Sequence, residues 1–387
     1  MLKGQNGLSL TSLEFLKEHN QLHLIEQIHF LSPSDVTAIN HQIDQLSKQR
    51  FSPLQSHNSL ENCSSISCLL KDSTPPSTLG EKAIQEEQAV AVLLAGGDGT
   101  RLGFQGPKGC FPVYKRPLKT LFHLHCEKIK KMEKKFGVSL SCVILTSENN
   151  HIQTKQFFDK HHFFDLNPSK IFFIQQPQLP LLTLENKWFL NPSKKIATAP
   201  NGNGAILELL KNHFSFFPKA RYFSIGNIDN PLPSLFDPFF LGQHINLDAD
   251  VSLKVIKRSS DKERLGVIAQ TAKGFKIIDY TQSEDLKNFL YCNINLFILS
   301  KPFLETFPFE NLPIYQVKKT GWHYDPITNL SSSIPVLKQE LFITDLLDYA
   351  LKPSLYLSQR DHTFSPLKQT KGPYGLYCLR KRLKRVI

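Results

Sequence analysis

The sequence predicts an α/β fold: a mixed, mainly parallel sheet with helices on both faces, preceded by an N-terminal helical extension. Short apolar runs of β-favouring residues recur from about residue 81 onward, and the first is "AVAVLLA" at 89–95. Helical patterns alternate with these runs, which is typical of parallel strands joined by crossover helices. The 387 residues are enough for one large α/β domain with additions.

The chain divides into three predicted segments. Residues 1–80 should form amphipathic helices followed by a Ser/Pro-rich connection at 51–80, residues 81–350 the main α/β domain, and residues 351–387 a C-terminal segment with a basic tail. Thr11 and Glu14 have the spacing of a capping box, which predicts a helix start at Thr11. Ser32 followed by Pro33 predicts a second helix start.

The main domain is predicted to be an ordered series of helices and strands. A short helix at 81–87 precedes the strand at 89–95, and a helical stripe that begins at Leu118 ends at Gly137. Five later apolar runs predict strands at 142–147, 170–176, 221–227, 251–256 and 288–299. Ligands of such sheets bind beyond the carboxyl ends of strands, where Gln176, Asp229 and Asn293 fall.

Composition indicates an ordinary globular protein, with 41% apolar and 21% charged residues. No apolar run approaches the roughly 18 residues of a membrane helix, and the N-terminus lacks a secretory signal core, so no membrane partner is expected. The seven cysteines form no Cys-x-x-Cys pair, which predicts reduced thiols and a cytoplasmic protein. The fourteen histidines show no metal-ligand spacing.

The net charge of +12 favours anionic partners. Part of this excess lies in the tail "RKRLKR" at 380–385, which is more typical of a solvated chain end than of a nucleic-acid patch. No aromatic-rich RNA-binding motif accompanies it, so no nucleic-acid partner is expected. Phosphorylated small molecules are the remaining class of partner.

The stretch "LLAGGDGTRLGFQGPK" at 93–108 places a glycine-rich loop directly after a strand. Glycines allow a sharp turn, and the backbone N–H groups of such a turn suit a phosphate. The loop departs from both common phosphate-binding patterns, because Lys108 is followed by Gly109 and Cys110, and Leu102 stands where a dinucleotide fingerprint needs a third glycine. We expect Lys108 to be an exposed loop lysine that supplies positive charge.

This loop resembles the signature of the eukaryotic-type UDP-sugar pyrophosphorylases. The resemblance continues in family order over about residues 80–370, through "QQPQLP" (175–180), "APNGNGA" (199–205), "GNIDN" (226–230), "ERLGVI" (263–268), "CNIN" (292–295), "LKQELFITD" (337–345) and "TFSPLK" (363–368). "PNGNGA" and "FSPLK" make it most similar to the UDP-N-acetylglucosamine pyrophosphorylases. The resemblance implies a Rossmann-like, glycosyltransferase-A-like nucleotidyltransferase that makes a UDP-sugar and pyrophosphate from UTP and a sugar 1-phosphate, with Mg²⁺.

The resemblance also implies roles for individual residues. Lys108, Lys368 and Arg101 would be catalytic, and Asp229 would hold Mg²⁺. The nucleotide would be bound by the loop residues Gly96, Gly97, Gly99 and Thr100. Two further residues, Gln176 and Gly202, would read the uracil edge. The sugar pocket would be lined by Asn203, Gly266, Asp279, Asn293 and Phe342.

Two departures from the family pattern leave the sugar open. Asp279 stands in place of a glutamate, and Thr344 stands in place of a second pocket aromatic. The substrate is therefore N-acetylglucosamine 1-phosphate, glucose 1-phosphate or both, and a strict UTP–glucose-1-phosphate uridylyltransferase is the alternative enzyme. A nucleotide-sugar or RNA-binding protein without activity is the alternative of another class. Taken alone, Asp229 could cap a turn, Phe342 could belong to the core and Lys368 could be a surface lysine.

Overall fold

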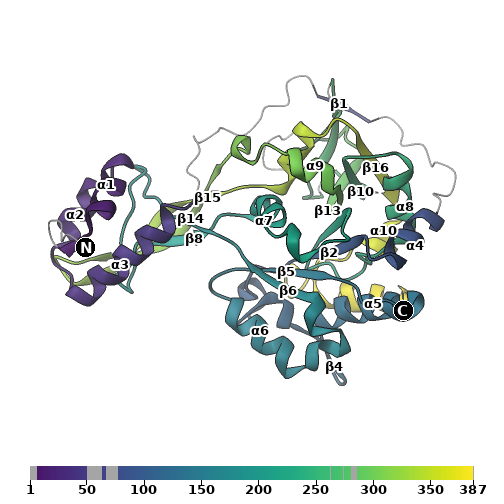
Figure 1. Cartoon of the computed structure of the whole chain (residues 1–387), viewed down its shortest axis with the longest axis horizontal. Coiled ribbons are helices and arrows are strands. Elements are labelled where there is room, and N and C mark those ends of the chain that lie inside the picture. The colour runs from purple at the N-terminus through teal and green to yellow at the C-terminus, as the bar shows by residue number, and fades with distance from the viewer. Residues whose placement is uncertain are drawn as a thin grey trace. The chain divides into compact units, whose positions relative to one another are not determined.

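The computed structural model describes residues 7–49, 63–66, 77–261, 263–272, 274–279 and 286–386. These residues form two compact units (Figure 1). Unit 1 comprises residues 1–56, 177–205 and 310–342, and unit 2 comprises residues 57–176, 206–309 and 343–387. Each unit is therefore assembled from non-consecutive segments, whereas the predicted segments 1–80, 81–350 and 351–387 are consecutive. The two predicted boundaries between these segments remain a prediction.

Unit 1 packs three helices against irregular chain and β-hairpins. The helices are α1 (Leu10–Glu18), α2 (Leu22–Ile28) and α3 (Pro33–Leu46), and the strand pairs are β7 (Gln178–Pro180) with β8 (Thr198–Pro200) and β14 (Tyr315–Asp325) with β15 (Leu330–Glu340). Apolar residues at helical spacing, such as Ile39 and Ile43, join one buried cluster with Trp188. The side chain of Gln42 bonds both backbone groups of Ile196, at 2.8 and 2.9 Å. These contacts tie the N-terminal helices to residues about 150 positions later.

The helix starts in unit 1 confirm one prediction and correct another. Ser32 caps α3, with Pro33 at its first position, as predicted. Helix α1 begins at Leu10, and its cap is Ser9, whose side chain accepts a hydrogen bond from the backbone N–H of Ser12. The predicted capping box that starts at Thr11 is therefore wrong, because Ser9 is an equally good cap and stands before the first apolar position of the helix.

Unit 2 is built on a sheet for which the described residues supply ten strands. Seven of them follow the order β1-β11-β13-β9-β2-β5-β6, while β12 pairs with β11, β10 pairs with β13, and β16 pairs with β10. Seven of these strands point in one direction, namely β2, β5, β6, β9, β10, β11 and β16. In Figure 1, α5 and α6 lie below strands β5 and β6, and α7 lies above them. The predicted mixed, mainly parallel sheet is confirmed.

The predicted strands of the main domain are all present. They are β2 (Ala89–Leu94), β5 (Cys142–Thr146), β6 (Ile171–Gln175), β9 (Tyr222–Asn227), β10 (Val251–Lys257) and β13 (Tyr291–Ser300). Every residue of β2 is buried, because it lies between the parallel strands β5 and β9. The strands that no pattern predicted are β1 (Ser64–Ser65), β3 (Pro112–Lys115), β4 (Leu118–Thr120), β11 (Val267–Thr271), β12 (Gly274–Ile278) and β16 (Pro353–Ser358).

The helices of unit 2 follow the predicted stripes with shifted ends. The predicted helix at 81–87 is α4, and it spans Ser77–Gln85. The predicted stripe from Leu118 becomes α5 (Leu121–Phe136), which ends at Gly137 as expected, while Leu118 lies in β4 and is exposed. The other helices are α6 (His151–Lys160), α7 (Ile206–Asn212), α8 (Pro238–Asn246), α9 (Lys301–Thr306), α10 (Arg360–Thr363) and α11 (Leu376–Val386).

Two predicted features of the sequence can be checked on these elements. Six cysteines lie among the described residues, and all six carry free thiols, including the buried Cys142 and Cys292. Most of the Ser/Pro-rich connection at 51–80 lies outside the described residues, apart from β1 and the start of α4. No helix in the described ranges is long and apolar enough to cross a membrane.

A buried histidine links α8 to the sheet. The Nδ1 atom of His244 lies 2.7 Å from the Ser252 hydroxyl of β10, which lies 2.6 Å from the Ser354 hydroxyl of β16. His244 is 1% exposed, and burial lowers its pKa to about 3. In the unfolded chain, the pKa of this ring returns to about 6.5. Between pH 6.5 and 3, the unfolded state therefore binds a proton that the folded state does not.

We therefore expect unit 2 to lose stability as the pH falls below about 6.5. A buried histidine such as His244 contributes about 2 kcal/mol to the loss of free energy of unfolding between pH 6.5 and 5, because one pKa unit corresponds to about 1.4 kcal/mol. His244→Asn, whose amide can still reach Ser252, should show a smaller difference in free energy of unfolding between pH 7 and pH 5. His362→Asn, at an exposed position, is the matched control. Equal pH dependence in both variants would contradict this assignment.

Candidate active site

The glycine loop after β2 is closed by its own backbone. Gly99 N–H donates to Gly106 C=O at 2.9 Å, and Lys108 N–H donates to Gly97 C=O at 3.0 Å. Thr100 and Arg101 are exposed. A Cβ atom added to Gly97 would meet no described atom within 4 Å, so open space adjoins the loop at this point. The loop therefore presents backbone, the exposed cation Arg101 and the exposed carboxylate of Asp98 to an open region. The backbone and the cation suit a phosphate.

The buried side chain of Asn150 holds the start of this loop, although no motif in the sequence indicated this role. Its side chain is fully buried, accepts from Ser147 N–H at 2.9 Å, and donates to Ala95 C=O at 3.2 Å and Gly97 C=O at 3.4 Å. Because it bonds both flanks of Gly96, it fixes the start of the loop. Nothing in "SENNHIQ" distinguishes this residue from an ordinary helix cap.

Gly96 and Gln176 lie against each other, as two predicted nucleotide-binding residues should. Gln176 follows β6, is 7% exposed, and donates its backbone N–H to Thr146 C=O at 2.8 Å. A Cβ atom at position 96 would lie 2.5 Å from Gln176 Oε1. A larger residue at position 96 would therefore displace the glutamine side chain from the loop.

Lys108 and Asp229 form an ion pair across two strand ends. Lys108 Nζ lies 3.2 Å from Asp229 Oδ2, and both side chains are largely buried. Lys108 follows the loop after β2, and Asp229 follows β9, which is the parallel neighbour of β2. The expectation of an exposed lysine is wrong, because the chain folds Lys108 inward onto this carboxylate. The arrangement places one positive and one negative charge at the carboxyl edge of the sheet.

The segment that carries Lys368 is bonded to the segment that carries Asp229. Leu367 N–H donates to Asp229 C=O at 2.8 Å. Asn230 donates from Nδ2 to Thr363 C=O at 2.9 Å and accepts at Oδ1 from Ser365 N–H at 3.1 Å. Lys368 itself is partly exposed, and its Nζ lies 5.8 Å from the centre of the Tyr374 ring. The structure thus brings Lys108, Asp229 and the Lys368 segment into one neighbourhood.

Two residues on one face of α5 contact backbone carbonyl groups that precede and follow Asp229 in the chain. The His125 ring Nε2 lies 3.2 Å from Ile228 C=O, and Lys128 Nζ donates to Pro231 C=O at 2.6 Å and to Leu232 C=O. Burial lowers the pKa of Lys128 to about 7 and the pKa of His125 to about 3. In the sequence, His125 is one position of the predicted helical stripe that begins at Leu118. Its spacing of three from Lys128 places both groups on the same helical face.

The predicted sugar-binding residues of unit 2 lie on the neighbouring strands. Asn293 N–H donates to Gly266 C=O at 2.9 Å, and Asn293 is 8% exposed. Its side-chain amide is bonded to Asn295, which lies in the left-handed region at φ 53°. Asp279 is exposed at the end of β12, directly before residues 280–285, which lie outside the described ranges. Gly266 and Asn293 are therefore brought together, and no contact of Asp279 with either is described.

The remaining predicted residues form a second group within unit 1. Gly202 has φ +93°, and a Cβ atom there would lie 2.4 Å from Leu341 C=O, so only glycine fits. Leu341 N–H donates to Asn201 C=O at 2.8 Å, which places the 201–204 segment beside Phe342. The Phe342 ring lies 5.3 Å from that of Tyr315. Gly202, Asn203 and Phe342 are thus neighbours in unit 1, while the other predicted residues belong to unit 2.

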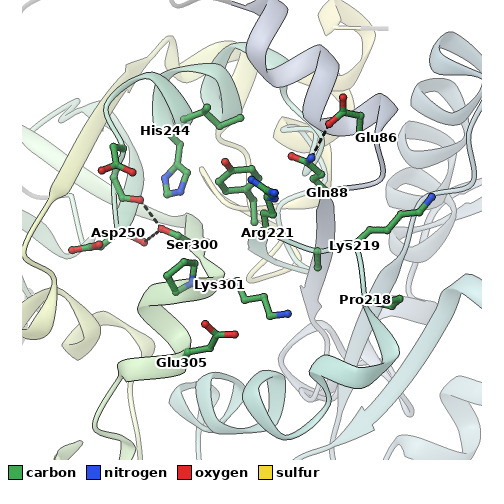
Figure 2. Close-up of a pocket in the computed structure, with 16 residues that line it drawn as sticks. Glu86, Gln88, Pro218, Lys219, Arg221, His244, Asp250, Ser300, Lys301 and Glu305 are labelled. Carbon is green, nitrogen blue, oxygen red and sulfur yellow. Dashed lines mark hydrogen bonds between the residues drawn. The ribbon is translucent and has the colours of Figure 1, made fainter.

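A cavity of about 810 Å³ opens at the opposite edge of the sheet (Figure 2). It is lined at the beginnings of β2, β9 and β10, by residues that include Gln88, Arg221, His244 and Asp250. None of the predicted site residues lines it. Because the strand ends that carry Lys108 and Asp229 lie at the other edge, beside the glycine loop and the Lys368 segment, we place the candidate active site at the carboxyl edge.

Comparison with known proteins identifies the family to which the chain belongs. Residues 34–299 match the family model described as UTP–glucose-1-phosphate uridylyltransferase. The UDP-N-acetylglucosamine diphosphorylase 2 of Arabidopsis thaliana is 29% identical over 324 residues, which cover 76% of this chain and 64% of that protein. The human UDP-N-acetylhexosamine pyrophosphorylase-like protein 1 is 30% identical over 318 residues, covering 76% and 62%. These matches thus span a little under two thirds of either relative.

Solved structures show the same fold. The uridine diphosphate N-acetylglucosamine pyrophosphorylase of Trypanosoma brucei, in complex with an inhibitor, aligns with a TM-score of 0.76 at 23% identity over 96% of this chain and 84% of that one. A UDP-glucose pyrophosphorylase of Leishmania major aligns with a TM-score of 0.62 at 18% identity, over 93% and 77%. The family model covers well over half of the residues, and the chain therefore belongs to the UTP–glucose-1-phosphate uridylyltransferase family.

Proposed function

We propose that this protein is a uridylyltransferase that converts UTP and a hexose 1-phosphate into a UDP-sugar and pyrophosphate. The observation that carries the proposal is the Lys108–Asp229 pair at the carboxyl ends of β2 and β9, beside the glycine loop. Family membership and the names of the relatives support the same reaction. The cytoplasmic location expected from the cysteines remains a prediction.

The reaction needs positioning and charge, not a protein nucleophile. The attacking oxygen belongs to a sugar phosphate that is already ionised at neutral pH, so no general base is required. Two polyanions must be held in line, and the negative charge that develops at the transferred phosphoryl group must be offset. The loop N–H groups, Arg101, Lys108 and Lys368 can do this if Lys108 exchanges the Asp229 carboxylate for a phosphate oxygen.

The proposed nucleotide and sugar roles are those that the resemblance of the motifs implies. Gly96, Gly97, Gly99 and Thr100 would wrap the phosphates, and the Gln176 amide would both donate to and accept from the uracil edge, with Gly202 as its partner in reading the base. The sugar would be bound by Asn203, Gly266, Asp279, Asn293 and Phe342. These assignments rest on the resemblance of the motifs and on the contacts between Gly96 and Gln176 and between Asn293 and Gly266.

Asp229 is the proposed ligand of Mg²⁺. The described residues contain no cluster of three or more His, Cys, Asp or Glu side chains that could hold a metal ion on its own. A single partly buried carboxylate fits the usual protein site for Mg²⁺, in which one or two carboxylates and the substrate phosphates share the coordination. When bound, the ion would neutralise phosphate charge. Release of Asp229 from Lys108 would free the carboxylate for this role.

The reaction itself is tested by measuring pyrophosphate release with a panel of nucleotides and sugar 1-phosphates. We expect UTP to be strongly preferred over ATP and CTP. A site whose buried polar groups pair with uracil rejects a base that leaves them unpaired, commonly by about 10⁴-fold or more. Equal use of ATP would contradict the uridylyl assignment, and absence of pyrophosphate release with every pair would favour a binding protein.

Replacing Lys108 by alanine should lower kcat by about 10²-fold or more, as expected for the loss of one preorganised donor to the transition state. Lys134→Ala, at an exposed position of α5, is the matched control. Because Asp229 loses its partner, the folded fraction of each variant is checked by circular dichroism and kcat is referred to folded protein. Turnover within twofold of the unaltered enzyme would remove Lys108 from the catalytic group.

Asp229→Asn should increase the Mg²⁺ concentration needed for half-maximal rate, because an amide oxygen is a weaker ligand for a hard cation than a carboxylate. Direct binding of Mn²⁺, followed by electron paramagnetic resonance in the presence of UTP, should weaken in parallel. An unchanged titration by both methods would show that Asp229 serves only to pair with Lys108 and to cap its turn.

The sugar preference is expected to be broad. Thr344 gives less apolar cover for an acetyl group than an aromatic residue, and one methyl-sized contact changes discrimination by about 10- to 200-fold. We therefore expect kcat/KM for N-acetylglucosamine 1-phosphate and glucose 1-phosphate to differ by no more than about 200-fold. Thr344→Phe should shift the ratio toward the acetylated sugar. A preference above about 10⁴-fold in the unaltered enzyme would exclude Thr344 as the determinant of selectivity.

A further inference from the structure

Strand β13 carries an irregularity beside the candidate sugar site. Its pairing with β10 jumps from Leu253 opposite Phe297 to Val255 opposite Asn293, so that three residues of β13 lie opposite one residue of β10. Within this bulge, Asn295 has φ 53°, a left-handed conformation that only glycine and, less often, asparagine and aspartate adopt without large cost. Bulges of this kind commonly re-aim a side chain next to a site.

The bulge coincides with a change of neighbour along β13. Near its start, Cys292 pairs with Val267 of β11, and from Leu296 onward the strand pairs with β9. Leu296 lies opposite Gly226, which is three residues before Asp229. The irregular residues therefore lie where the sugar-binding strand joins the strand that leads to the proposed metal ligand.

Two hydrogen bonds in this bulge fix the side chain of Asn293. Asn295 N–H donates to Asn293 Oδ1 at 2.7 Å, and Asn293 Nδ2 donates to Asn295 Oδ1 at 2.7 Å. A backbone N–H can only donate, so the atom facing it must be the oxygen of the Asn293 amide. The orientation of this amide, which is otherwise ambiguous, is thereby determined by chemistry.

The consequence concerns what Asn293 can offer a ligand. Its Nδ2 atom carries two N–H groups, one of which is committed to Asn295. The other N–H remains, and its position is set because the amide cannot rotate by 180° without placing an NH₂ group against Asn295 N–H and an oxygen against Asn295 Oδ1. Asn293 is thus held ready as a hydrogen-bond donor before any substrate arrives.

We propose that Asn295 is a positioning residue for sugar recognition, which locks the Asn293 amide so that its remaining N–H donates to an acceptor oxygen of the sugar. This inference rests on the proposed function, in which Asn293 contacts the sugar. Preorganisation of this kind lowers the entropy that the enzyme must lose when the sugar binds. Asn295 itself does not need to touch the substrate.

The test compares two substitutions that both suit a left-handed residue. Asn295→Gly keeps the backbone conformation and the backbone N–H but removes the acceptor for Asn293 Nδ2, so the Asn293 amide is held at its oxygen alone and gains mobility. Asn295→Asp keeps an acceptor oxygen in the same place. We expect Asn295→Gly to raise KM for the sugar 1-phosphate by about tenfold, the effect of one lost hydrogen bond, with KM for UTP unchanged. Asn295→Asp should stay within about threefold of the unaltered enzyme.

A second readout does not depend on activity. With asparagine labelled by ¹⁵N, relaxation of the Asn293 side-chain amide should report a rigid group in the unaltered protein and in Asn295→Asp, and a mobile group in Asn295→Gly. Equal mobility in all three proteins would overturn the proposal even if no substrate were turned over, whereas absence of turnover in the unaltered enzyme would overturn only the proposed function. A tenfold loss that affects UTP and sugar equally, or affects both variants equally, would show a general structural role and would also overturn it.

Discussion

The candidate active site depends on the ion pair between Lys108 and Asp229. The two residues are 121 positions apart, and they meet because β2 and β9 are parallel neighbours whose carboxyl ends lie at the same edge of the sheet. Both side chains are only 10–13% exposed, and a charge so far removed from water is costly unless it is paired. Each charge therefore makes the burial of the other possible, and the pair keeps the glycine loop and the β9 loop together. In the proposed reaction, a phosphate would replace Asp229 as the partner of Lys108, and Mg²⁺ would replace Lys108 as the partner of Asp229.

Other contacts make this pair a fixed point of unit 2. His125 and Lys128 bond carbonyl groups on both sides of Asp229, and the backbone of Leu367 bonds Asp229 from the C-terminal segment. The aspartate is thus held by helix α5, by the sheet and by the segment that carries Lys368. Asn150 does the same for the start of the glycine loop, and Asn295 does so for Asn293. His125, Lys128 and Asn150 thus act from outside the recognisable motifs on residues inside one. Asn295 acts on Asn293 from within the motif "CNIN".

The sequence was informative where a pattern has a single physical meaning. The run "AVAVLLA" had to be a strand buried on both faces, and the glycines that follow it had to form a turn. The order of motifs along the chain identified the family. The sequence was less informative where the outcome depends on tertiary context. Lys108 was expected in solvent, because a local pattern cannot reveal a partner 121 residues away. Asn295 occupies a position that strand periodicity treats as ordinary, and its left-handed conformation occurs where β13 changes from pairing with β11 to pairing with β9. The helix cap at Ser9 was missed because two equally good caps lie two residues apart.

The central claim is that Lys108 exchanges the carboxylate of Asp229 for a phosphate of the nucleotide. A crystal structure of the full chain with UTP and Mg²⁺ tests this most directly. The account predicts that Lys108 Nζ leaves its present position, 3.2 Å from Asp229 Oδ2, and lies within hydrogen-bond distance of a phosphate oxygen, with the Asp229 carboxylate turned toward the metal ion. A structure in which the nucleotide is bound while the Lys108–Asp229 pair remains intact would contradict the account, because the pair would then be a structural support and not the centre of the reaction.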